Sequence, residues 1–253
     1  MEICALTDPK RILVTGGNGL LASELSKLED STRDTTWIFK SRKHLNILDM
    51  SQIAKAIDDT RADVIFHAAA LTKPMVLHER DPARSILNNI VGTSNIAMAC
   101  IGHGIKMTYV STDWVYSGKG NTGMYLEEEG CNPTTNYGRS KLGGECAVQM
   151  VPSHLILRTS MTPKPFPHKV AFTDCIKSSM YIEDAAKIMK NAVDNDIEGI
   201  YNLGGPAISI YDFAEQENPE IEGTFRSSIK DMSIPENTSM NCTKLERALQ
   251  WKR

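Results

Sequence analysis

The stretch Arg11-Ile-Leu-Val-Thr-Gly-Gly-Asn-Gly-Leu-Leu-Ala22 decides the fold, because a short apolar run passes through a glycine-rich turn into a helical pattern. The run is nearly continuous, as in a strand buried on both faces. Gly16 permits the tight turn and Gly19 lets the backbone approach a pyrophosphate, while Ala22 is small enough for the helix to pack closely on the strand. The N–H groups at the start of the helix would then face the phosphates. A purely structural turn is the alternative explanation of the glycines.

Apolar runs alternate with helical patterns along the first 160 residues. The predicted strands are residues 11–15, 37–40, 63–67, 106–110, 154–158 and 199–203, and the predicted helices are residues 20–28, 83–100, 137–150, 181–193 and 243–249. This alternation predicts right-handed crossovers and a parallel sheet covered on both faces, which is a doubly wound α/β fold of the Rossmann type.

The pattern loosens after Arg158. Residues 161–167 carry three prolines, which exclude regular helix or a central strand there. We therefore expect a nucleotide-binding Rossmann domain over residues 1–158. Residues 159–253 are expected to form a small substrate-binding lobe that partly rejoins the sheet.

Composition excludes several classes of protein. The chain has 253 residues, with 28 Lys plus Arg against 31 Asp plus Glu, so it lacks the basic excess of nucleic-acid binders. No apolar run approaches the roughly 20 residues of a membrane helix, and the chain start lacks the layout of a signal peptide. The six cysteines contain no Cys-x-x-Cys pair, which disfavours zinc and redox sites and fits a reducing compartment. We expect a cytoplasmic protein without nucleic-acid, membrane or metal partners.

The turn after the second predicted strand indicates which dinucleotide is bound. A NAD site usually offers an acidic residue to the ribose about 20 residues beyond the glycines. Here the sequence is Lys40-Ser41-Arg42-Lys43, whose cations and hydroxyl could bind a 2′-phosphate, with Arg42 stacking or pairing bidentately. Asn46 and Ile47 follow where the chain should pass the adenine. The pattern favours NADP over NAD, with a solvated basic turn as the alternative.

Two further motifs carry candidate catalytic groups. Residues 110–115 lie just past a predicted strand, at the carboxyl edge where such sheets bind ligands. Tyr137 and Lys141 are one helical turn apart and so share a face. The Lys141 ammonium would lower the pKa of Tyr137, letting the phenol transfer a proton near neutral pH, while Thr112, or less readily Ser111, would hold the substrate oxygen. An ordinary amphipathic helix is the alternative explanation of the Tyr-x-x-x-Lys spacing alone.

Together these motifs resemble those of the extended short-chain dehydrogenase/reductases. The shared motifs are Thr15-Gly-Gly-Asn-Gly-Leu-Leu-Ala22, Ala68-Ala-Ala70, Asn89-Ile-Val-Gly-Thr93, Ser111-Thr-Asp-Trp-Val115, Asn136-Tyr-Gly-Arg-Ser-Lys141 and Leu157-Arg-Thr-Ser160. Within that superfamily the chain is most similar to the dTDP-4-dehydrorhamnose reductase family, which are sugar-nucleotide reductases that use NADPH or NADH. The likeness covers about residues 10–160 well.

The resemblance implies a reaction and a set of residues. Hydride would pass from NADPH to C4 of a nucleotide-linked 4-keto-6-deoxy sugar while Tyr137 protonates the new alkoxide, with Thr112 and Lys141 completing the catalytic set. The predicted cofactor-binding residues are Gly16, Gly19, Leu20, Leu21, Lys40, Ser41, Arg42, Asn46, Ile47, Ala68, Ala69, Ala70, Asn89, Val110, Ser111, Tyr137 and Lys141, and the predicted substrate-binding residues are Asp113, Trp114, Met161 and Lys169.

The sequence departs from related enzymes at three places. Family dehydratases follow their Ser-Thr-Asp with a Glu base, where this chain has Trp114. Epimerase/reductases of the fucose pathway have a Cys two places beyond the catalytic Ser, where this chain has Asp113. Rhamnose-type reductases usually have Trp after Arg-Thr-Ser, where this chain has Met161 and a proline-rich connection. The reaction type survives these departures, whereas the sugar and the nucleotide stay open.

Two other functions stay open as well. A non-catalytic NADP-binding regulatory subunit is the main alternative, because the methionine adenosyltransferase β subunit resembles the same family. Retention of Thr112, Tyr137 and Lys141 favours catalysis, whereas the short second lobe and the missing Trp favour regulation. A NAD-linked 4-epimerase is disfavoured by the basic turn. A homodimer through the predicted helices 83–100 and 137–150 is also expected, since extended members commonly form one.

Other polar residues are expected to be structural. His67 ends a buried strand, where we expect it to hydrogen-bond locally. The acidic run at residues 127–129 is expected to be a solvated loop, since charge runs usually lie at the surface.

Overall fold

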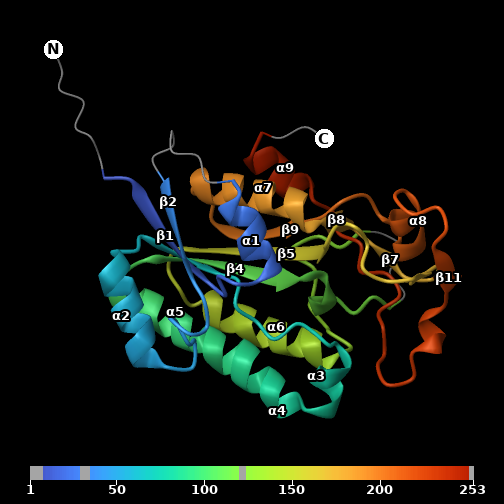
Figure 1. The fold of residues 1–253 in the computed structure, drawn as a ribbon, viewed down its shortest axis with the longest axis horizontal. Helices are drawn as coiled ribbons and strands as arrows, with labels where there is room; N and C mark the ends of the chain where they lie inside the picture. Colours follow the sequence, from blue (N-terminus) through green and yellow to red (C-terminus); the bar gives the residue numbers. More distant parts are fainter. Residues whose placement is uncertain (1–7, 29–34, 120–123, 251–253) are drawn as a thin grey trace.

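The computed structural model describes residues 8–28, 35–119 and 124–250. Its centre is a seven-stranded sheet in the order β2-β1-β3-β4-β5-β8, with β9 also paired to β5. All of these pairings are parallel. The strands are β1 (Lys10–Thr15), β2 (Thr35–Lys40), β3 (Val64–His67), β4 (Lys106–Thr112), β5 (His154–Thr162), β8 (Ser179–Tyr181) and β9 (Gly199–Leu203). The predicted doubly wound Rossmann-type sheet is thereby confirmed (Figure 1).

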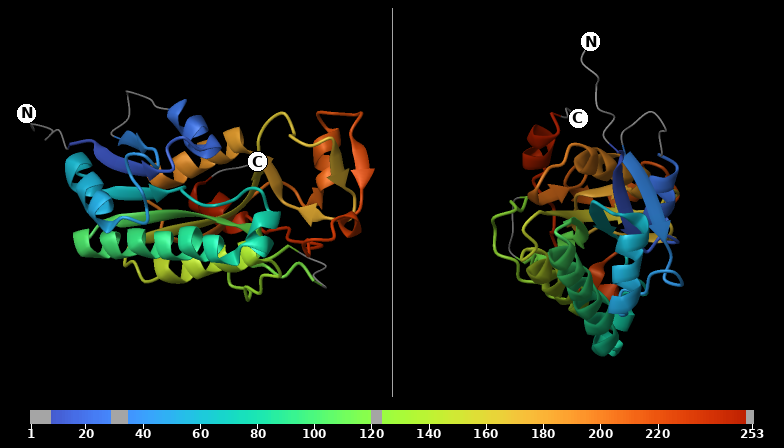
Figure 2. Two further views of the ribbon diagram at one scale, coloured as in Figure 1. Left: turned by 60° about the horizontal axis from the view of Figure 1, so that its bottom comes forward. Right: turned by 90° about the vertical axis from the view of Figure 1, so that its left-hand side faces the viewer.

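Helices cover both faces of this sheet (Figures 1 and 2). One layer contains α1 (Leu20–Ser26) and α7 (Ile182–Asp194), and the other contains α2 (Met50–Thr60), α5 (Gly92–His103) and α6 (Asn136–Val148). Alternate side chains of one strand pack against opposite helix layers, because successive side chains point to opposite faces of the sheet. Ile12 and Val14 pack with the α1 and α7 layer, whereas Leu13 packs with the other.

The predicted helix over residues 83–100 is interrupted. It consists of α4 (Pro82–Ser85), the π-helical segment η1 (Ile86–Val91) and α5, preceded by the short helix α3 (Val76–Arg80). A π turn widens the helix locally and is frequent at functional sites. Here it contains Asn89, which is fully buried. Helix α2 was not predicted, although Asp49 accepts hydrogen bonds from the backbone of Ser51 and Gln52 as an N-cap.

Part of the chain beyond β5 builds a small C-terminal part that extends past one end of the sheet (Figure 2, left). Its elements are β6 (Val170–Phe172), β7 (Ile176–Lys177), β10 (Ile208–Ser209), α8 (Ile210–Glu215), β11 (Glu222–Thr224) and the 3₁₀ turn η3 (Arg226–Ser228). The last helix, α9 (Thr243–Ala248), lies instead beside β9 of the main sheet (Figure 1). Strand β6 pairs with β11 and β7 pairs with β10. The domain boundary at residue 158 stays a prediction, because β5 runs across it.

The expectation that residues 161–167 contain no central strand is wrong at its start. Strand β5 continues through Met161 and Thr162, which pair with Met180 and Tyr181 of β8 before the first proline. No helix of the described residues is long and apolar enough to cross a membrane. Most of the chain start on which the signal-peptide expectation rests, residues 1–7, lies outside the described ranges.

Candidate active site

A cleft lies at the carboxyl ends of the central strands. It consists of two adjoining cavities of about 370 and 340 Å³, whose walls share Gly16, Gly19, Ala68 and Ala70. These residues follow β1 and β3, the neighbouring strands between which the chain order of the sheet reverses. This is the position where open α/β sheets bind nucleotides.

The glycine turn forms a cradle that no larger residue fits. Gly16 has a φ of +72°, and a Cβ there would lie 2.9 Å from the Ala69 Cα. A Cβ on Gly17 would lie 2.9 Å from the Lys40 backbone nitrogen. The backbone N–H of Gly17 donates a hydrogen bond to the Lys40 carbonyl oxygen at 2.8 Å. Gly17 therefore lets the turn pack against β2, while Gly16 and Gly19 bring backbone to the cleft wall, which fits the close approach of a dinucleotide pyrophosphate.

The smaller cavity suits a phosphorylated ribose. Its wall includes Ser41, Arg42 and Lys43, with Asn46 and Ile47 beside them, and no acidic side chain is among its described lining residues. A guanidinium and an ammonium bind phosphate oxygens through charge-assisted hydrogen bonds. The residues present therefore fit the adenosine half of NADP better than that of NAD, whose 2′-hydroxyl calls for an acidic partner.

A buried histidine, His67, contacts the residue that precedes the glycine turn. The hydroxyl of Thr15 accepts a hydrogen bond from Ala69 N at 3.1 Å and lies 2.8 Å from His67 Nδ1. His67 Nε2 lies 3.1 Å from the Thr93 hydroxyl. His67 is thus hydrogen-bonded within the fold, as expected of a structural residue, but its partners lie 52 and 26 positions away in the sequence. Burial, with a smaller contribution from Lys141, lowers the pKa of His67 to about 3.

This shift predicts a loss of stability in acid. Between pH 6.5 and 3 the unfolded chain binds a proton at His67 that the folded chain excludes, so stability falls as pH decreases. At 1.36 kcal/mol per pH unit, we expect the free energy of unfolding to fall by about 2–3 kcal/mol between pH 6.5 and 4.5. Urea titrations of the wild type and His67→Gln would measure it. An equally steep loss in the variant would show that other groups are responsible.

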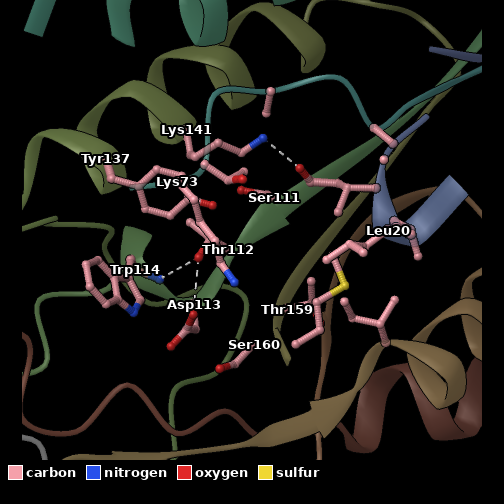
Figure 3. Close-up of a pocket in the computed structure, with 18 of the residues that line it drawn as sticks. Leu20, Lys73, Ser111, Thr112, Asp113, Trp114, Tyr137, Lys141, Thr159 and Ser160 are labelled. Atoms are coloured by element: carbon pink, nitrogen blue, oxygen red, sulfur yellow. Dashed lines mark hydrogen bonds between the residues drawn. The ribbon is translucent and has the colours of Figure 1, made fainter. Parts of the chain in front are cut away.

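The larger cavity brings the candidate catalytic groups together. Val110, Ser111 and Thr112 at the end of β4 line it, together with Tyr137 and Lys141 from the first turns of α6 (Figure 3). Lys141 Nζ donates to the Val110 carbonyl at 2.7 Å. It also lies 4.1 Å from the centroid of the Tyr109 ring.

Two contacts fix the start of α6. The Thr135 side chain accepts a hydrogen bond from Gly138 N at 3.1 Å as an N-cap. A Cβ on Gly138 would lie 2.2 Å from the Trp114 carbonyl oxygen, so only glycine lets α6 approach this closely. The Tyr137 ring consequently lies between those of His78 and Trp114, at centroid distances of 5.0 and 5.9 Å.

The predicted pKa shift of Tyr137 is reversed. Burial raises the pKa of Tyr137 well above its usual value, a hydrogen bond with Thr112 opposes this, and Asp113 adds to it. Burial lowers the pKa of Lys141 to about 7, against the effect of Glu145. The sequence could not reveal that desolvation dominates the pKa of Tyr137. A phenol that stays protonated is nevertheless suited to donate a proton.

A buried network holds β4, α6 and β5 in place. Glu145 Oε1 accepts a hydrogen bond from Ser111 at 2.5 Å, and Glu145 Oε2 pairs with Arg158 at 2.8 Å. Arg158 also donates to the Tyr116 hydroxyl at 3.0 Å and to the Glu127 carbonyl at 3.1 Å. The solvated-loop expectation is wrong for Glu127, which is buried and accepts from Asn202 N at 2.9 Å.

Comparison with known proteins identifies the family. Residues 10–162 match the family model described as RmlD substrate binding domain. This chain belongs to that family. It is 29% identical to the dTDP-4-dehydrorhamnose reductase of Sinorhizobium fredii, over 94% of this chain and 90% of the relative. It is 27% identical to methionine adenosyltransferase 2 subunit beta of Xenopus tropicalis, over 94% of this chain and 82% of the relative.

A solved structure supports the fold of this RmlD-family chain. The dTDP-4-dehydrorhamnose reductase of Bacillus anthracis, solved in complex with NADP, superposes with a TM-score of 0.84 at 22% identity. The match covers 95% of this chain and 97% of that one.

Most of the predicted site residues of the RmlD-family chain line the cleft. Besides those named above, the walls include Leu20, Leu21, Ala69, Asp113, Trp114 and Met161. Lys40, Asn89 and Lys169 lie outside both walls, so their contact with a ligand stays a prediction. Asn89 is turned inward by the π turn, where it bonds the Leu71 backbone at 2.7 and 2.9 Å. Lys169 is exposed next to β6.

Two lysines that the sequence did not single out line the larger cavity of this RmlD-family protein. Lys73 lies in the segment after β3 and Lys177 lies in β7. Neither belongs to a motif of the nucleotide-binding part. Their position depends on how the chain folds back over the sheet, which no local pattern reveals.

Proposed function

We propose that this RmlD-family protein is an NADPH-dependent reductase of the C4 keto group of a nucleotide-linked 4-keto-6-deoxy sugar. The observation that carries the proposal is one continuous cleft with Ser41, Arg42 and Lys43 at one end and Thr112, Tyr137 and Lys141 at the other. The names of the bacterial relatives support the same reaction class.

Each residue of the proposed catalytic set has one task. NADPH, when bound, would supply the hydride. Tyr137 donates its phenolic proton to the oxygen of the reduced carbon. The Thr112 hydroxyl, which donates to Asp113 in this structure, would turn to orient that oxygen when substrate is bound. Lys141, with a pKa of about 7, can return a proton to the phenolate at neutral pH. The buried Glu145 and Arg158 pair keeps these groups aligned from behind.

Turnover tests this proposal. The purified protein would be supplied with NADPH and a panel of dTDP- and UDP-linked 4-keto-6-deoxyhexoses, and the products would be identified by NMR and mass spectrometry. We expect NADPH oxidation with at least one sugar, with reduction at C4. NADPH binding without turnover of any sugar on the panel would overturn the reductase proposal.

Arg42→Ala should weaken NADPH binding by about 10- to 100-fold, because a charged hydrogen bond contributes about 1.5–3 kcal/mol. NADH affinity should change about twofold at most, since NADH lacks the 2′-phosphate. Fluorescence titration would measure both affinities. The matched control is Lys55→Ala, an exposed cation on α2. Equal losses for NADPH and NADH would contradict the assignment of Arg42 to the 2′-phosphate.

A regulatory subunit remains the second candidate, and the relatives named methionine adenosyltransferase 2 subunit beta favour it. Such a protein would bind NADP and a catalytic partner without reducing a sugar. Light scattering of mixtures with a methionine adenosyltransferase catalytic subunit would detect the complex. A complex together with failed turnover would favour this function over the reductase.

We also propose a homodimer through the helices around η1 and α6. Exposed apolar side chains lie on this segment, namely Ile86, Leu87, Val91, Met98 and Ile101. Light scattering after gel filtration should give twice the 28.0 kDa chain mass. A monomer mass at micromolar concentration would end this proposal.

A further inference from the structure

A lysine from the C-terminal part reaches the substrate end of the cleft. Lys177 Nζ lies 2.6 Å from Asp113 Oδ2. Both side chains are buried, with exposed fractions of 8% and 2%, and both residues line the larger cavity. The ion pair therefore joins β7 to the residue that directly follows Thr112.

Both oxygens of Asp113 are already engaged. Thr112 Oγ1 donates to Oδ1 at 3.1 Å, while Lys177 Nζ and Thr238 Oγ1 donate to Oδ2 at 2.6 and 2.5 Å. Figure 3 shows the Asp113 carboxylate below Thr112, on the side away from Lys141. These bonds fix the carboxylate and leave it little capacity to bind a ligand.

Lys177, in contrast, keeps donors for a ligand. An ammonium has three N–H groups. Among the residues that the structure describes, Lys177 Nζ donates a hydrogen bond to Asp113 alone, so it has further N–H groups for a ligand. The nitrogen lies 4.8 Å from the centroid of the Trp114 ring, which is itself 5.9 Å from the Tyr137 ring. Trp114 therefore lies next to both the ammonium and the proposed proton donor.

The net charge of the Lys177–Asp113 ion pair determines whether a hydroxyl or a carboxylate oxygen of a sugar fits beside it. Ammonium and carboxylate at this distance largely cancel each other, and burial strengthens their attraction. A sugar hydroxyl can accept a hydrogen bond from Lys177 without adding charge. A sugar carboxylate would place a second anion beside Asp113 in a buried position, where like charges disfavour each other.

We propose that Lys177 is a substrate-binding residue that donates to uncharged sugar oxygens, and that its pair with Asp113 makes the cleft select neutral sugars over sugars with a carboxylate. This inference rests on the proposed function for the class of ligand, a nucleotide-linked sugar. It adds a residue of the C-terminal part to the site and explains how the cleft distinguishes sugars by charge.

Binding tests the role of Lys177 separately from turnover. Calorimetry on the NADP-loaded protein would use the dTDP and UDP forms of glucose and of glucuronic acid. We expect the wild type to prefer the glucose form, and Lys177→Met to weaken its binding about tenfold or more, the loss of one charged hydrogen bond. Lys177→Arg should recover part of the affinity. The control is Lys187→Met, an exposed lysine on α7.

A second set of variants tests the selection of neutral sugars over sugars with a carboxylate. Asp113→Asn leaves the ammonium uncompensated, so the preference should move about tenfold toward glucuronic acid, the effect of one charge-assisted contact. The double variant Asp113→Asn with Lys177→Gln should cancel that change. Circular dichroism and NADP affinity would verify folding, and Lys177→Gln replaces Lys177→Met if the latter does not fold.

The outcomes separate the two proposals. Wild-type affinity in Lys177→Met, or no binding of any glucose form, would overturn the binding role of Lys177, even where turnover of a 4-keto sugar is established. An unchanged preference in Asp113→Asn would overturn the selection by charge. Selective binding that depends on Lys177 supports it, even where the protein turns over no sugar and the reductase proposal fails.

Discussion

Tyr137→Phe should lower kcat about 10²- to 10⁴-fold, the usual contribution of a positioned proton donor. The phenyl ring can keep the packing against His78 and Trp114, so NADPH affinity and folding should change little. The expected loss therefore comes from the missing hydroxyl alone. Steady-state kinetics with the sugar that the wild type reduces would measure it, and cofactor titration would verify the bound state.

Tyr211→Phe is the matched control for this experiment. Its hydroxyl bonds Glu215 on α8, away from both cavities. We expect this variant to retain wild-type kcat. A Tyr137→Phe enzyme that also kept nearly the full kcat would show that another group protonates the product.

Arg158→Met should destabilise the fold by about 3–5 kcal/mol, because it leaves the Glu145 carboxylate charged, buried and unpaired. Glu145 is completely buried and Arg158 is 3% exposed, so water cannot replace the lost partner. Unfolding in urea, followed by circular dichroism, would give the free energy of unfolding.

Two further variants separate the ion pair from general packing. Lys187→Met removes an exposed ion pair with Asp184, for which we expect a change of at most about 1 kcal/mol. The double variant Arg158→Met with Glu145→Leu should recover part of the stability, because no buried charge remains. If Arg158→Met changed the free energy no more than the exposed control does, the buried pair would have no special role.

The sequence predicted the elements whose pattern is local. The apolar runs at β1, β3 and β4 and the glycine cradle follow from strand burial and turn geometry, which neighbouring residues determine. The placement of Tyr137 and Lys141 together follows from one turn of helix. These features need no knowledge of the rest of the chain.

Features that depend on distant contacts could not be predicted. Lys177 reaches Asp113 across 64 positions of sequence, and Asn89 is turned inward because a π turn interrupts an otherwise ordinary helical pattern. The pKa of Tyr137 depends on its burial, which only the assembled cleft determines. The tertiary arrangement therefore decides the charge states and the substrate end of the site.

Strand β5 also constrains how the molecule can move. Its first part is hydrogen-bonded on both sides, to β4 and to β9, and its last three residues pair with β8 beside the substrate end. Domain closure needs a segment whose backbone torsions can change freely, and a strand held in this way has little such freedom. We therefore expect the distance between the nucleotide end and the sugar end to change little on ligand binding, and any rearrangement to be confined to the loops that border the opening.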